Sequence, residues 1–329
     1  MKNLYKILIL LAVLSFGITL YFFSKTSITD TSKLEKPVWA IRSIDTVKYS
    51  RDLAREKVNS STFDLTIDSQ VRNIKSTGAT HIALGTPYDA EFKPFLKKWV
   101  TSARRYGLKV WFRGNFSGWE ESFGYSSIDR KTHLESTEKF IVDNPDLFED
   151  EDIFTSCPEC ENGGTGDPRK TGDVAGFRAF LIDEYNISNS AFQKINKNVK
   201  VGYYSMNYDV AKLIMDPATT SSLGGIVAID HYVASPEQLI TDSIKIASSS
   251  GGKVVLGEFG APIPDLNGDM TESEQAEWIG KALEALSNTS EVVGVNYWVN
   301  VGGSTQIWDS EGTPKKAVEI IIKYYNLTR

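Results

Sequence analysis

The sequence predicts a single α/β domain folded as a (β/α)8 barrel. Eight short apolar runs, rich in β-branched and aromatic residues, alternate with segments of helical periodicity. Most of these runs are continuously apolar, as expected for parallel strands that are covered on both faces. A doubly wound open sheet is the main alternative, but no glycine-rich phosphate loop follows the first run. We therefore expect residues 37–329 to form one barrel, a fold that usually takes about 250 residues.

The eight runs are the candidate strands, and helical segments lie between them. The strands are expected at Val38–Ile44, His81–Gly85, Lys109–Phe112, Ile153–Cys157, Lys200–Tyr204, Ile226–His231, Lys253–Gly257 and Val292–Trp298. One helix is expected over residues 91–106 and ends before Gly107. A capping box from Thr271 to Glu274 opens another helix. The last helix follows Pro314.

The first residues differ from the rest of the chain. Lys2 and Lys6 precede an uninterrupted apolar run over residues 7–23. This pattern predicts a signal peptide or membrane anchor at residues 1–24 and a polar linker at residues 25–36. An anchor is favoured, because no cleavage site with small residues is evident. The domain would then be extracytoplasmic, touching the membrane through this segment only, or secreted if the segment is cleaved.

Charge and cysteine content exclude several classes of partner. The formal net charge of −6 argues against nucleic-acid binding, which needs a basic surface. Cys157 and Cys160 are the only two cysteines and can form a disulfide. A redox-active pair is disfavoured because no thioredoxin-like unit surrounds them. A zinc site is disfavoured because no second pair of ligands accompanies them. The segment from Asp265 to Asp269 partly resembles a calcium loop, but its glycine is misplaced, so a polar loop over the active site is favoured. We expect no metal and no cofactor, and the oligomeric state stays open.

Carboxylates at predicted strand ends are the candidate catalytic groups, because the active site of this fold lies at the carboxyl ends of its strands. They are Asp230 on the sixth strand, Glu258 at the end of the seventh, and Glu159 or Glu161 after the fourth. Glu258 follows four apolar or small residues, so it lies at the barrel mouth or is buried. A carboxylate there is costly unless it is hydrogen-bonded or used in catalysis. A purely structural glutamate is the alternative.

The residues around Glu258 resemble a known group of enzymes. Gly257-Glu258-Phe259-Gly260, followed by Pro262, is similar to the nucleophile segment of glycoside hydrolase clan A, the retaining (β/α)8 hydrolases. The resemblance implies that Glu258 is the nucleophile, that Trp298 floors the subsite for the cleaved sugar, and that Tyr232 or His231 hydrogen-bonds the nucleophile. Strand alternation puts Tyr232 on the face of Asp230 and His231 on the opposite face.

The resemblance also implies an acid/base glutamate after the fourth strand. Glu159 takes that position, with Glu161 as the fallback, and Pro158 stands where the clan has an asparagine that contacts the sugar. Asn162 or Asn115 is a candidate substitute for that asparagine. Two carboxylates about 5–5.5 Å apart give a retaining double displacement, in which one acts as acid and the other as nucleophile.

Three further residues are candidates for substrate binding. Trp119 is expected to face the sugar, while Arg42 and Arg113 lie at predicted strand ends and can bind the nucleophile or the substrate. The resemblance thus implies hydrolysis of an extracellular oligo- or polysaccharide. The departure at Pro158 leaves a non-catalytic carbohydrate-binding barrel as the alternative.

Overall fold

A computed structural model describes residues 38–328, in which eight parallel strands form one sheet with the order β4-β3-β2-β1-β8-β7-β6-β5. The strands are β1 (Ile41–Asp45), β2 (His81–Leu84), β3 (Lys109–Phe112), β4 (Ile153–Phe154), β5 (Ser205–Asn207), β6 (Ile226–Asp230), β7 (Lys253–Phe259) and β8 (Val292–Tyr297). The two edges of the sheet approach each other through a parallel bridge between Ile153 and Lys200. This arrangement agrees with the predicted (β/α)8 barrel.

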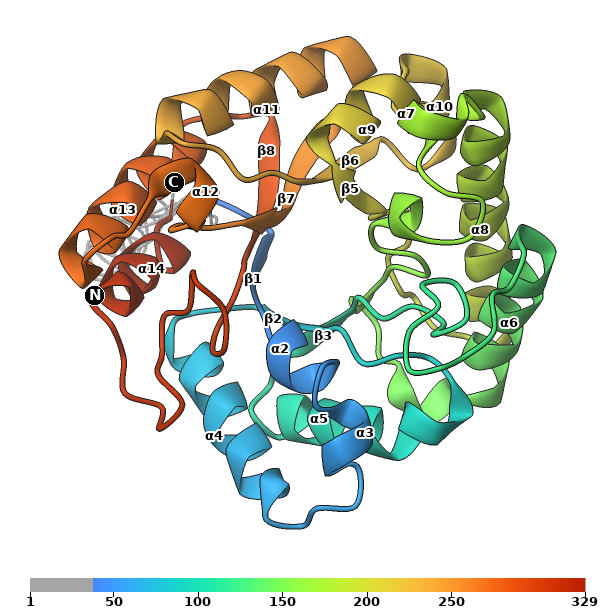
Figure 1. Ribbon diagram of the computed structural model, residues 1–329, viewed down its shortest axis with the longest axis horizontal. Coiled ribbons are helices and arrows are strands. Elements are labelled where there is room, and N and C mark those ends of the chain that lie inside the picture. Colours follow the sequence, from blue (N-terminus) through green and yellow to red (C-terminus); the bar gives the residue numbers. More distant parts are fainter. Residues whose placement is uncertain (1–37, 329) are drawn as a thin grey trace, which may run out of the picture. The chain divides into compact units, whose positions relative to one another are not determined.

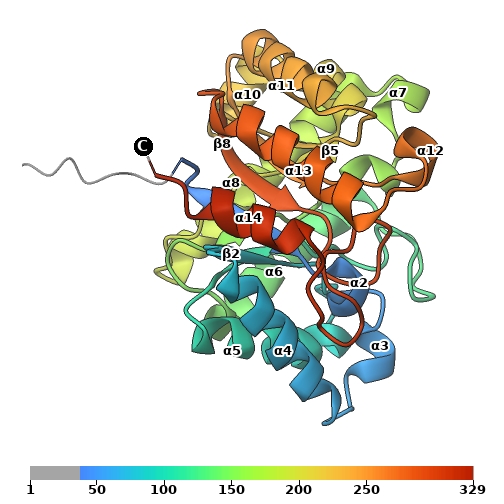
Figure 2. The same ribbon diagram turned by 90° about the vertical axis from the view of Figure 1, so that its left-hand side faces the viewer.

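Helices surround the strands on the outside (Figure 1). The longer ones are α4 (Phe63–Ser76), α5 (Lys93–Arg105), α6 (Arg130–Asp143), α8 (Val174–Lys194), α11 (Pro236–Ser250), α13 (Glu272–Ser287) and α14 (Ala317–Tyr325). Shorter helices lie in the connections: α2 (Val47–Ser50), α3 (Ala54–Lys57), α7 (Pro168–Thr171), α9 (Tyr208–Ile214), α10 (Pro217–Ser222), α12 (Pro264–Asn267), and the 3-10 turns η1 (Ala90–Phe92), η2 (Pro145–Leu147) and η3 (Cys160–Asn162). The side view in Figure 2 places α2, α3 and α12 at the same end of the barrel.

The barrel interior is filled by side chains from alternating positions of the strands. Its apolar layer consists of Ile41, Ala83, Trp111, Ile153, Ala228 and Val255. The indole N–H of Trp111, which is fully buried, donates to Thr155 Oγ1 at 2.9 Å. Satisfying this polar hydrogen lets a large ring fill the centre of the barrel. Trp111 thereby forms a floor below the carboxyl ends of the strands.

Most predicted elements are present, with two displaced strands. The fifth strand was expected at 200–204, but it begins at Ser205. Gly202 explains the shift, because it adopts a φ of +87° and a side chain there would come within 2.3 Å of the Leu223 carbonyl oxygen. The first strand begins at Ile41 rather than Val38 and extends through Asp45. The predicted capping box between Thr271 and Glu274 is confirmed.

The segment predicted as signal peptide or anchor, residues 1–24, and the linker at 25–36 lie outside the described residues. Within residues 38–328, no helix combines the length and the apolar character needed to cross a membrane.

Candidate active site

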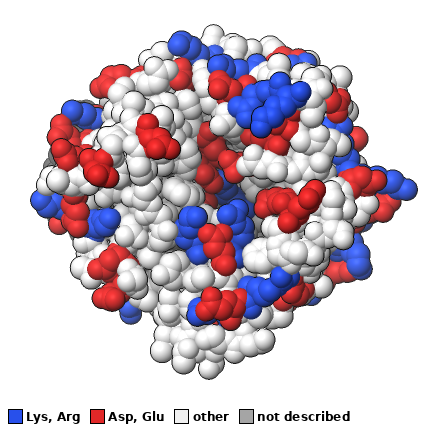
Figure 3. Space-filling view, viewed as in Figure 1, with Lys and Arg blue, Asp and Glu red and all other residues white. Residues whose placement is uncertain are grey.

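A pocket opens at the carboxyl ends of the strands, in the face seen in Figure 1. Side chains from the ends of β1, β3 and β7 and from the loops after β3 and β4 line it. The space-filling view shows the centre of this face hollowed, with acidic side chains inside the hollow (Figure 3). The pocket therefore occupies the place where enzymes of this fold carry their catalytic groups.

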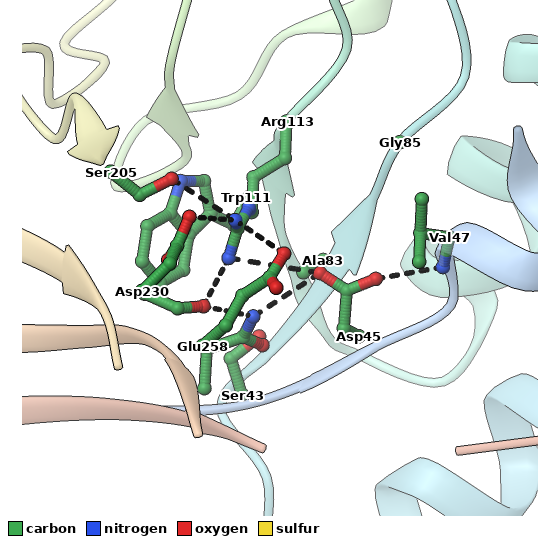
Figure 4. Close-up of polar contacts among 12 residues, drawn as sticks. Ser43, Asp45, Val47, Ala83, Gly85, Trp111, Arg113, Ser205, Asp230 and Glu258 are labelled. Carbon is green, nitrogen blue, oxygen red and sulfur yellow. Dashed lines mark hydrogen bonds and ion pairs between the residues drawn. The ribbon is translucent and has the colours of Figure 1, made fainter. Parts of the chain in front are cut away.

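Arg113 lies at the centre of the site, directly after β3, and is almost completely buried (5% exposed). Its Nη2 donates to Glu258 Oε1 at 2.9 Å, to Ser205 Oγ at 3.0 Å and to Asp230 Oδ2 at 3.4 Å. Its Nη1 donates to the Gly257 carbonyl and lies 3.7 Å from Asp45 Oδ2. Figure 4 shows these side chains converging on the guanidinium group. One cation thus orders carboxylates from three different strands.

Glu258 is held from two sides near the end of β7. Besides the bond from Arg113 to Oε1, the hydroxyl of Tyr232 donates to Oε2 at 2.8 Å. Gly257 permits this placement, because a Cβ there would lie 2.5 Å from Asp230 Oδ1 and 2.6 Å from Ser205 Cβ. The glycine before the glutamate is therefore required by the close approach of β6 and β7.

Glu159 reaches the same pocket from the loop after β4. Its backbone is left-handed (φ 44°), and its N–H donates to the Ser205 carbonyl at 2.8 Å. A disulfide joins Cys157 to Cys160 around it, and Asn162 Nδ2 donates to Glu159 Oε2 at 3.2 Å. A short, cross-linked loop thus carries Glu159 in the wall of the pocket that Glu258 also lines.

Burial and mutual repulsion raise the pKa values of the carboxyl groups in the site. Burial, the charge of Glu258 and the charge of Glu161 raise the pKa of Glu159 to about 7. Burial and Asp230 raise the pKa of Glu258 to about 8, against the lowering effect of Arg113 and Tyr232. Burial also raises the pKa of Asp230 to about 7. Groups this close share their protons, and the cluster titrates as one system.

Those pKa values do not by themselves assign an acid and a nucleophile, since the pKa of Glu258 is raised further than that of Glu159. The hydrogen bonds distinguish the two groups. A guanidinium and a phenol both donate to Glu258, whereas among the described residues only the Asn162 amide donates to the Glu159 side chain. Donors to a carboxylate favour its ionised form, and charged donors do so most strongly. These contacts favour ionisation of Glu258, whereas the amide that donates to Glu159 is neutral.

Several predicted residues take part in the site or border it. The half-buried Trp298 packs edge-on against Tyr232, with ring centroids 5.7 Å apart, beside the nucleophile candidate. His231 points away, stacks on Tyr208 at 4.3 Å and bonds Asp242, as the strand alternation predicts. Glu161 is buried outside the pocket, where its Oε1 accepts the Asn207 N–H at 2.7 Å.

Two predicted substrate contacts are wrong. Arg42 is the second residue of β1, and it donates to the carbonyls of Gly78 and Trp39 at the opposite end of the barrel. Trp119 is 1% exposed: its ring stacks on Phe180 with centroids 5.0 Å apart, and it supports the catalytic loop rather than a sugar.

Asn115 lines the pocket, but its amide is engaged by protein groups. Its Nδ2 donates to Glu120 Oε1 at 3.3 Å and to Cys157 Sγ at 3.7 Å. Asn115 therefore holds the pocket wall, and in this state has no amide hydrogen directed at a ligand.

Other residues of the site were not predicted from the sequence. Asp45 accepts from the Val47 N–H at 2.7 Å and from Asn296 Nδ2 at 3.2 Å. Asn296 also donates to the Gly257 carbonyl at 2.8 Å. Asp45 directly follows the predicted first strand, so the strand-end rule applies to it as it does to Glu258. Asn296 lies inside β8, two residues before Trp298, and carries no comparable signal.

The chain matches no protein-family model, and no curated protein is similar to it in sequence. Solved structures with the same fold include glycoside hydrolases. Two belong to subfamily GH5_18: the protein from Bifidobacterium longum has a TM-score of 0.63 at 14% identity, covering 87% of this chain and 77% of its own. The one from Streptomyces cattleya has a TM-score of 0.64 at 13% identity, covering 88% of this chain and 80% of its own.

A β-D-glucuronidase of Dictyoglomus thermophilum has a TM-score of 0.59 at 14% identity over 89% of this chain. The match covers only 51% of that enzyme, so this chain spans about half its length. At such identities the likeness establishes the fold, while the chemistry has to be argued from the site.

Proposed function

We propose that this protein hydrolyses O-glycosidic bonds of an oligo- or polysaccharide with retention of configuration. Glu258 acts as the nucleophile and Glu159 as the acid/base. The observation that carries the proposal is the Glu258 carboxylate at the end of β7, held at 2.9 Å by Arg113 and at 2.8 Å by Tyr232, in the pocket that Glu159 also lines. The fold shared with glycoside hydrolases supports it.

The two carboxyl groups supply the two functions that glycoside cleavage requires. Protonated Glu159 donates its proton to the leaving oxygen, while anionic Glu258 attacks the anomeric carbon and forms a glycosyl ester. Glu159, then ionised, removes a proton from water, and the resulting hydroxide releases the sugar from Glu258. The rise in the pKa of Glu159 to about 7 keeps a proton available to it near neutral pH.

Isosteric variants test the two roles on aryl glycosides. Glu258→Gln is expected to abolish turnover without unfolding the protein, because an amide cannot form the glycosyl ester. Glu159→Gln is expected to hydrolyse substrates with poor leaving groups about 10²–10⁴-fold more slowly than the parent. It should lose much less on dinitrophenyl glycosides, whose leaving group needs no proton. Glu161→Gln is the matched comparison, and its loss is expected to be far smaller.

Azide rescue adds a stereochemical readout. In Glu159→Ala, azide can attack the glycosyl ester and give a glycosyl azide of retained configuration. In Glu258→Ala, azide replaces the carboxylate and gives the inverted product. Near-normal hydrolysis by Glu258→Gln would refute the assignment. Sugar binding by the parent with no product from any substrate would instead favour a non-catalytic carbohydrate-binding barrel, the alternative motivated by Pro158.

A further inference from the structure

Two charged side chains of the pocket have no part in the two-carboxylate reaction. Arg51 follows α2, Glu120 lies in the loop after β3, and both line the pocket together with Glu159 and Glu258. Burial lowers the pKa of Arg51, but the charges of Asp52 and Glu120 more than offset this effect. Within residues 38–328 no direct ion pair joins Arg51 to Glu120. The two groups thus face the same space without neutralising each other by contact.

A buried polar chain fixes Glu120 from behind. Glu184 on α8 and His133 on α6 are both fully buried, and Glu184 Oε1 lies 2.8 Å from His133 Nδ1. His133 Nε2 lies 3.0 Å from Asn115 Oδ1, which also accepts the Phe116 N–H at 2.8 Å. Because Asn115 Oδ1 faces the Phe116 N–H and the His133 ring, the Asn115 amide nitrogen points to Glu120 Oε1 and Cys157 Sγ. The position of the Glu120 carboxylate is therefore set by two helices.

Such a pair suits the hydroxyl groups of a sugar. A carboxylate accepts hydrogen bonds only, a guanidinium donates only, and a hydroxyl can do both. Among the described residues, no side chain or backbone group donates to Glu120 Oε2, while Asn115 occupies Oε1. A hydroxyl in the pocket can donate to this free oxygen and accept from Arg51. Burial raises the pKa of Glu120, so this carboxylate gains when a ligand supplies a donor.

The charge of the pocket bears on which sugars it accepts. Four carboxyl side chains line it, those of Asp45, Glu120, Glu159 and Glu258, against the two guanidinium groups of Arg51 and Arg113. Arg113 is already shared among carboxylates, and Arg51 Nε bonds Asp52 at 3.0 Å. A sugar that carries its own carboxylate would add a further negative charge to a pocket in which carboxyl groups already outnumber guanidinium groups.

From these observations we infer that Glu120 and Arg51 recognise the hydroxyl groups of an uncharged sugar and that the pocket rejects uronic acids. This inference rests on the proposed glycosidase function and adds its substrate class. It separates this chain from the structural neighbours named β-glucuronidases.

Binding to the full-length Glu258→Gln protein tests the inference, because this variant holds glycosides without cleaving them. Matched pairs of methyl β-glycosides and their methyl uronides, in the gluco, galacto and manno series, are titrated and followed by NMR. At least one neutral sugar is expected to bind about tenfold or more tightly than its uronide. Adding Glu120→Gln is expected to weaken binding of the neutral sugar by about tenfold, since a hydrogen bond to a charged group is lost.

Glu121→Gln is the control, because it makes the same charge change at an exposed neighbour that does not line the pocket. A uronide that binds as tightly as its neutral partner overturns the inference. So does a Glu120→Gln effect no larger than that of Glu121→Gln. If no member of any pair binds, the proposed function itself fails, and that outcome is distinct from a reversed preference.

Discussion

Replacing Arg113 by methionine probes the balance of charge in the pocket directly. Methionine keeps much of the side-chain volume and removes the only cation in contact with Glu258, Asp230 and Asp45 among the described residues. The three contacts are 2.9, 3.4 and 3.7 Å long. The carboxyl groups would remain buried on their strands, so the variant isolates the electrostatic contribution of one guanidinium group.

The size of the effect follows from the contacts. Two unit charges about 4 Å apart attract by about 4 kcal/mol at an effective dielectric constant of about 20. Protonation limits the loss at neutral pH, because the pKa values of Asp230 and Glu258 in the folded parent are already raised to about 7 and about 8. Breaking a buried ion pair usually costs about 3–5 kcal/mol. We expect Arg113→Met to lower the free energy of unfolding by about this amount near pH 9, where both groups are ionised in the folded parent.

The loss should depend on pH with a defined sign. Without Arg113 the pKa values of Glu258 and Asp230 in the folded state rise above the parent values of about 8 and about 7. The unfolded state is the same in both proteins, so the deficit develops where these groups are ionised in the folded parent and protonated in the variant. The deficit is therefore smallest near pH 5 and grows as the pH rises through 7 to 9, by at most about 1.4 kcal/mol per pH unit for each group. Urea unfolding followed by tryptophan fluorescence measures it. Arg113→Lys, which keeps the charge, should lose less stability. Equal deficits of Arg113→Met at low and high pH would refute the reasoning.

Two further variants test other contacts of the site. Tyr232→Phe removes the hydroxyl that stabilises anionic Glu258. The acid limb of the pH profile of kcat/KM should therefore move up by roughly one pH unit. An unchanged acid limb would argue against this contact. Trp119→Ala removes a buried ring and its bond to the Cys160 carbonyl, and should lower the free energy of unfolding by about 3–5 kcal/mol. Trp119→Phe should lower the free energy of unfolding by less. An alanine variant of unchanged stability but weakened sugar binding would restore Trp119 as a substrate contact.

The sequence located the parts of the site that obey a positional rule. Glu258 follows an apolar strand, and a strand end in a barrel is the mouth of the barrel. The same rule found Asp230 and Arg113. It misplaced Arg42, because the apolar residues before Ile41 made the first strand look longer at its beginning and shorter at its end. A shift of three residues moves a side chain from one end of a strand to the other.

Packing and second-layer contacts could not be predicted. Trp119 and Glu120 are adjacent, yet one fills the core behind the catalytic loop and the other lines the pocket. Composition does not distinguish an aromatic ring that stacks on sugar from one that stacks on phenylalanine. The chain from Glu184 through His133 to Asn115 joins two helices and a loop, and such contacts depend on tertiary geometry rather than on local pattern.

The polar cluster around Arg113 joins segments that are very far apart along the chain. Arg113 and Glu258 are separated by 145 positions, and Asp45 and Asn296, which bond each other, by 251. Contacts of such long range form only after much chain entropy has been lost. The β1–β8 neighbours must meet before the cluster exists, so no partly folded chain lacking either end holds the complete site. Under the proposed function, catalytic activity should therefore report on completion of the barrel, whereas helix content reports on its local parts.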